Sequence, residues 1–118
     1  MKVISWKNAD FDNGTISEIK VTPLCHNSNA REMQIVMPAL SALKEHKAPF
    51  DITLQVLRGE IEFRARGQSV RLGELDMVSL GAGELLLVSA VKDSIARLSM
   101  AMDAEKMKEM QTKMPPKR

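Results

Sequence analysis

The sequence predicts an all-β fold, a small barrel or sandwich built from short strands. Apolar segments recur about every eight to twelve residues with turn residues between them, as is typical of such folds. In residues 58–72, Ile61 and Phe63 alternate with the charged Glu62 and Arg64, the period of a strand with one buried face. The 118 residues are enough for one domain with one core.

The first half of the chain contains three predicted strands. Residues 15–21 alternate in the manner of a strand, and residues 32–37 form the next one, which Pro38 ends. Residues 39–45 are open to two interpretations, a helical turn by propensity or a strand edge or loop by their flanks. Residues 51–57 are rich in apolar and β-branched side chains and predict the third strand.

The second half begins with a β-hairpin over residues 58–72. Gly67 and Gln68 are the predicted turn, after which Val70 and Leu72 continue the apolar face. Further strands are predicted over residues 76–80, 85–90 and 95–102.

The character of the chain changes after residue 102. Residues 103–113 consist of good helix formers, and Met107, Met110 and Met114 share one face at helical spacing. Such a stripe usually packs on its own domain or on a second subunit. We therefore divide the chain into a barrel domain, residues 1–102, and a short C-terminal helix with a basic tail, residues 103–118.

Composition excludes several classes of function. The formal net charge is +2 and charges of both signs alternate, which argues against nucleic acid as a partner. No apolar run approaches the roughly 18 residues of a membrane span. The single cysteine, Cys25, cannot form an internal disulfide, so we expect a cytoplasmic protein.

Residues 40–59 have the spacing of the first sequence motif of the cupin family, small RmlC-like β-barrels, which this region resembles. That motif runs glycine, five residues, His-x-His, three or four residues, glutamate, six residues, glycine. The residues at its defined positions here are Leu40, His46, Ala48, Ile52 and Gly59.

The second cupin motif also fits without a gap. It runs glycine, five residues, proline-x-glycine, two residues, histidine, three residues, asparagine, and its positions are Leu75, Gly81, Gly83, Leu86 and Ala90. The resemblance covers roughly residues 30–100. It implies a jelly-roll barrel, a double-stranded β-helix with metal ligands in its interior, and a homodimer, since many cupins are dimers.

The ligand positions of these motifs are mostly aliphatic. Only His46 is a residue type that binds metals, whereas Ala48, Ile52 and Leu86 have no lone pair to donate. We therefore expect no metal cofactor. The alternative is a divalent transition metal held by His46 with unconventional ligands, in an enzyme of the isomerase or dioxygenase type.

No catalytic residue is predicted. The second histidine, His26, lies beside Cys25 in what reads as an unpatterned loop, and neighbours on a strand point in different directions.

The replaced positions predict an apolar barrel interior, either filled as an ordinary core or hollow enough for a small apolar ligand anchored by His46. We expect a metal-free, non-enzymatic protein that binds such a molecule or acts as a sensing or structural module. A scaffold that only associates, through the methionine stripe, is a third possibility. The residues predicted to line the interior are His46, Ala48, Ile52, Leu54, Phe63, Leu86 and Val88.

Overall fold

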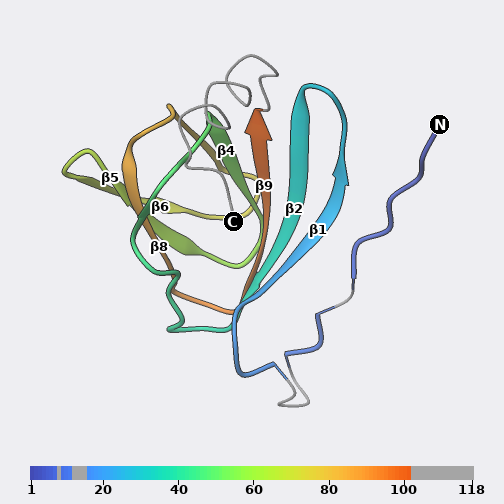
Figure 1. Ribbon diagram of the computed structural model, residues 1–118. Helices are drawn as coiled ribbons and strands as arrows, with labels where there is room; N and C mark the ends of the chain where they lie inside the picture. The colour runs from blue at the N-terminus through green and yellow to red at the C-terminus, as the bar shows by residue number, and fades with distance from the viewer. Residues whose placement is uncertain (8, 12–15, 102–118) are drawn as a thin grey trace, which may run out of the picture.

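The computed structural model of the protein describes residues 1–7, 9–11 and 16–101. Within these ranges the chain forms strands and no helix, which confirms the all-β prediction (Figure 1). In the same ranges there is no helix long and apolar enough to cross a membrane. The predicted helix over residues 103–113 and its methionine stripe lie outside the described residues.

The strands form two antiparallel sheets that face each other (Figure 1). Sheet A has the order β1-β2-β9-β4-β7, and sheet B has the order β3-β8-β5-β6. The strands of sheet A are β1 (Lys20–His26), β2 (Ala30–Met37), β9 (Ser94–Ala101), β4 (Ile52–Arg58) and β7 (Met77–Leu80). Those of sheet B are β3 (His46–Lys47), β8 (Leu85–Ala90), β5 (Ile61–Ala65) and β6 (Gln68–Leu72).

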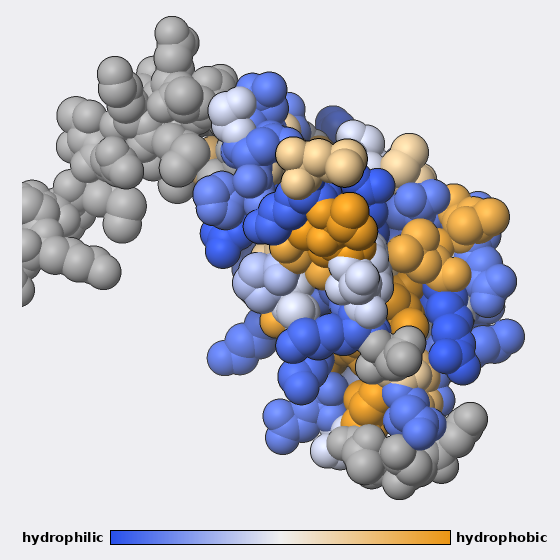
Figure 2. All heavy atoms as spheres, turned by 90° about the vertical axis from the view of Figure 1, so that its right-hand side faces the viewer, coloured by the Kyte–Doolittle hydropathy of each residue, from blue (hydrophilic) through white to orange (hydrophobic). Residues whose placement is uncertain are grey.

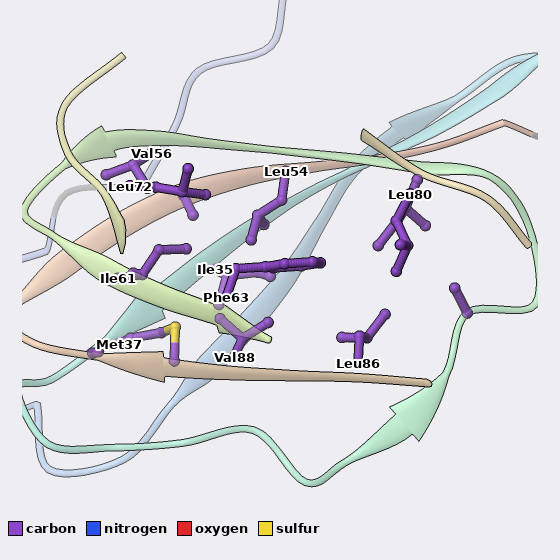
Figure 3. Packing of buried hydrophobic residues seen from close by; sticks show 14 residues of the cluster. Ile35, Met37, Leu54, Val56, Ile61, Phe63, Leu72, Leu80, Leu86 and Val88 are labelled. Atoms are coloured by element: carbon purple, nitrogen blue, oxygen red, sulfur yellow. The ribbon is translucent and has the colours of Figure 1, made fainter. Parts of the chain in front are cut away.

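The core lies between the sheets because each strand turns alternate residues inward. On β4, Ile52, Leu54 and Val56 are buried while Thr53 and Gln55 stay partly exposed, as the alternation predicts. The same parity buries alternate residues of β5 and β8, namely Ile61, Phe63, Leu86, Val88 and Ala90. The residues of this cluster (Figure 3) are Ile35, Met37, Ala48, Ile52, Leu54, Val56, Ile61, Phe63, Leu72, Leu80, Leu86, Val88, Ala90 and Ala96.

The first strand differs from its prediction. It runs from Lys20 to His26, whereas residues 16–19 of the predicted strand lie outside it. Cys25 and His26 are therefore strand residues, which pair with Glu32 and Arg31 of β2. An irregularity between Pro23 and Cys25, where Leu24 has no partner in the pairing, shifts the register. The pairing with β2 gives this segment its strand conformation. The alternation of residues within a segment does not indicate which strand it pairs with.

The hairpin turn lies one residue earlier than predicted. Arg66 and Gly67 form it, with φ of 55° and 73°, and Gln68 already pairs with Ala65. Two central residues with positive φ match the right-handed twist of the flanking strands. Residues 39–45 follow the interpretation as a strand edge or loop. Ala42 makes an isolated bridge with Ser89 of β8, and three backbone hydrogen bonds join Leu40, Ser41 and Leu43 to the same strand.

The backbone independently confirms the register of both cupin motifs. The two motifs specify glycine at four positions in total, and all four have a left-handed φ here. These are Leu40 (69°), Gly59 (90°), Leu75 (71°) and Gly83 (85°). Glycine adopts this conformation without steric cost, whereas for a bulky residue such as leucine it is uncommon. The chain therefore keeps the turns of the motifs even where the glycine is replaced.

Gly59 is the position where the fold tolerates no side chain. A Cβ there would lie 2.3 Å from the Asp93 carbonyl oxygen and 2.4 Å from Ser94 Oγ, in addition to the positive φ. We expect Gly59→Ala to lower the free energy of unfolding by about 2 kcal/mol or more. Gly67→Ala is the matched control, since a Cβ at Gly67 meets nothing within 4 Å. Urea denaturation of both variants checks this, and equal losses would contradict the close-approach explanation.

Candidate functional site

Six of the seven residues predicted to line the barrel interior belong to the hydrophobic core. Each of them is at most 6% exposed, and their side chains pack against the cluster between the sheets (Figure 3). They are Ala48, Ile52, Leu54, Phe63, Leu86 and Val88. Three of the four motif positions that carry ligands in cupins, Ala48, Ile52 and Leu86, therefore contribute packing here.

His46, the seventh, lies apart from this cluster. It is an exposed residue of the two-residue strand β3 and pairs with Leu86 at one edge of sheet B. Its imidazole Nδ1 donates a hydrogen bond to the Lys44 carbonyl oxygen at 2.7 Å. The ring is thus tied to its own loop.

The donor set at the motif positions does not fit a metal ion. A transition metal in a protein normally needs at least three N, O or S ligands. Here one exposed imidazole is accompanied by the buried aliphatic side chains of Ala48, Ile52 and Leu86. No group of three or more His, Cys, Asp or Glu residues within the described ranges could hold a metal.

A pocket of about 220 Å³ opens at the seam between β6 and β7, the last strands of the two sheets. Phe63 and Leu80, both core residues, lie at its inner end, so it reaches the packed interior from the side. The residues that line this seam pocket are Phe63, Ala65, Arg66, Gln68, Val70, Val78, Ser79, Leu80 and Gly81.

The rim of the seam pocket is polar and its wall is apolar. Arg66, Gln68 and Ser79 are exposed, whereas Val78 and Ala65 are partly buried. The Arg66 guanidinium is 3.8 Å from the Glu84 carboxylate, and both side chains are in contact with solvent. A wall of this kind suits an apolar body, and the rim offers hydrogen-bond donors to a polar end.

The sequence prediction found Phe63 but missed the rest of the seam pocket. The prediction placed the site at the motif positions, and His46 lies on the opposite edge of sheet B from β6. The order of the strands would have indicated this pocket, because β6 and β7 end their sheets and side chains between them are only partly covered. That order follows from long-range pairing.

A charged cluster lies on the outer face of sheet A. Arg97 Nε donates to the Glu32 carboxylate at 2.7 Å, and Ser99 Oγ donates to the other carboxylate oxygen at 2.5 Å. The Arg97 hydrogen bond lowers the pKa of Glu32, and Glu32 in turn raises the pKa of Arg97. The pair is ionised at neutral pH and acts as a fixed polar contact between β2 and β9.

Known structures resemble this fold over most of its length. An RmlC-like cupin with a double-stranded β-helix fold from Methanocaldococcus jannaschii is 17% identical, with a TM-score of 0.74 over 92% of this chain and 96% of that one. An RmlC-like cupin from Desulfovibrio desulfuricans is 19% identical, with a TM-score of 0.72 over 86% and 96%. KdgF from a Halomonas species is 16% identical, with a TM-score of 0.69 over 79% and 88%.

No protein-family model and no curated protein matches the sequence. The structural likeness therefore carries the assignment, together with the two motif registers and their four left-handed turn positions. The protein has the RmlC-like cupin fold, a double-stranded β-helix.

Proposed function

We propose that this chain is a metal-free, non-enzymatic cupin module that binds a small apolar molecule in the seam pocket. The observation that carries the proposal is the pocket itself, a cleft of mixed polar and apolar lining that reaches Phe63 and Leu80 of the core. The ligand that fits is a compact apolar body with one hydrogen-bond acceptor directed at Arg66 or Gln68.

The size of the pocket limits the ligand. Drug-sized ligands occupy pockets of roughly 300–1,000 Å³, and a dry engineered cavity of about 150 Å³ is known to take up benzene. A volume of about 220 Å³ lies between the two. The ligand class is therefore a single ring or a short branched chain.

The aliphatic motif positions support a metal-free role. A metal-binding side chain at these buried positions would be polar, and a polar group buried among aliphatic side chains costs free energy unless it has a partner such as a metal ion. Ala48, Ile52 and Leu86 pack in the core and have no atom that could bind a metal. A metal-dependent isomerase or dioxygenase finds no support in these residues.

Benzene is a suitable first probe for the seam pocket. Titration at millimolar concentration should shift the methyl NMR signals of Val70, Val78 and Leu80 and leave those of the outer face of sheet A unchanged. Ala65→Leu adds a side chain that fills the apolar wall, so we expect it to weaken benzene binding at least tenfold.

Ala42→Leu is the matched control, since Ala42 is exposed in the loop before β3 and should leave the titration unchanged. Shifts that persist in Ala65→Leu, or the absence of saturable shifts in the unmodified chain, would contradict binding at the seam. In the second case the sensing or structural role would remain.

We also propose that the chain forms a homodimer. Support comes from several large hydrophobic residues that are well exposed, among them Leu40 (90%), Leu75 (71%) and Met77 (62%). Within the described residues, the edge strands β1 and β3 also pair on one side only, and covering an edge is one way in which native proteins protect it.

Sedimentation at micromolar concentration should give a particle of twice the 13.1 kDa chain mass. A particle of the single chain mass, unchanged as the concentration rises a hundredfold, would contradict the dimer.

A further inference from the structure

The N-terminal residues 1–7 are called here the strap, and Ile4, Trp6 and Lys7 of this segment contact the outer face of sheet A. In this segment Ile4 and Trp6 are partly buried, whereas Ser5 and Lys7 are exposed, the alternation of an extended chain. Ile4 and Trp6 line a hollow of about 310 Å³ together with side chains of β1, β2, β4 and β9. The sheet residues of this hollow are Leu24, Cys25, Glu32, Gln55, Leu57 and Arg97.

One side chain of the sheet recognises the strap backbone. Gln34 Oε1 accepts a hydrogen bond from the Lys7 backbone N–H at 3.0 Å, and Gln34 Nε2 donates to the Lys7 carbonyl oxygen at 2.8 Å. The amide thus pairs with both backbone groups of one residue, as a neighbouring strand would. Gln34 is only 1% exposed, so the covered amide is fully satisfied by this contact.

The strap has few other attachments. Within the described ranges, no hydrogen bond between backbone atoms joins residues 1–7 to a strand. Nearby, the Arg58 guanidinium carbon lies over the Phe11 ring, 5.6 Å from its centroid. By contrast, β2 and β9 share a ladder of eight residue pairs. Segments with few backbone bonds open at lower free energy than the ladders beside them.

We propose that the strap opens from sheet A while the barrel stays folded, and that Gln34 is the latch that holds it closed. Opening uncovers an apolar face that includes Leu24 and Leu57, together with the Glu32–Arg97 pair. On the side of the molecule that carries the N-terminal segment, hydrophobic residues already lie in a discontinuous band among hydrophilic ones (Figure 2). The strap therefore controls how much apolar surface this side presents.

Limited trypsin digestion tests the opening, because the bond after Lys7 is cleaved only when its carbonyl leaves Gln34. Cleavage after Arg97, inside β9, requires global unfolding and serves as the internal reference. In the unmodified chain, cleavage after Lys7 should be at least a hundredfold faster than after Arg97. Gln34→Leu removes both latch bonds and should raise the Lys7 rate about tenfold or more.

Ile4→Ala changes only the strap, so it should also raise the Lys7 rate while leaving the Arg97 rate unchanged, even if Gln34→Leu disturbs the barrel. Thr53→Val, an isosteric change on the same sheet, is the matched control and should alter neither rate. Equal Lys7 and Arg97 rates in the unmodified chain, or Lys7 rates unaffected by both Gln34→Leu and Ile4→Ala, would overturn the proposal. Trp6 is the only tryptophan, so its emission gives a second readout of the strap.

Discussion

The two sheets depend on one shared apolar core, to which β2, β4, β5, β8 and β9 contribute alternate residues. Val56, Ile61 and Ala96 are at most 1% exposed, and they come from both sheets. Because strand side chains alternate with a period of two, a register slip of one residue would turn a whole set of core residues outward. The inward parity of β4, β5, β8 and β9 therefore fixes the register of the sheets, and it also decides which side chains can reach a ligand.

The turns at the motif positions connect this core to the cupin fold. Gly59 lies so close to Asp93 and Ser94 that only glycine fits, and it joins β4 of sheet A to β5 of sheet B. Leu40 and Leu75 adopt the same left-handed conformation at a steric cost that glycine would avoid. The backbone thus has the turns of the motifs, while three of their four ligand positions hold the aliphatic residues Ala48, Ile52 and Leu86. In this fold the turns of the motifs can form without metal-binding side chains at the ligand positions.

The sequence predicted the parts of the structure that local patterns determine. Alternation located β5, and runs of apolar and β-branched residues located β4 and β8. The motif spacing matched positions 40 and 75, but their left-handed turns came from the structure. The sequence prediction failed for β1, because the strand conformation of Cys25 and His26 depends on pairing with β2. It also missed the seam pocket and the contact between Gln34 and the strap, since both form between segments that are distant in the sequence. The alternation of residues within strands and the spacing of motifs do not indicate which strands lie side by side at the edges of the sheets.

The central claim is that core-packing residues, and not metal ligands, occupy the ligand positions of the cupin motifs. A measurement of metal content tests it most directly. The chain would be purified from medium supplemented with iron, manganese, nickel and zinc, and analysed by mass spectrometry for each metal, alongside His46→Ala. The account predicts far less than one equivalent of any metal in both proteins, with no difference between them. Near-stoichiometric metal in the unmodified chain, lost in His46→Ala, would contradict it.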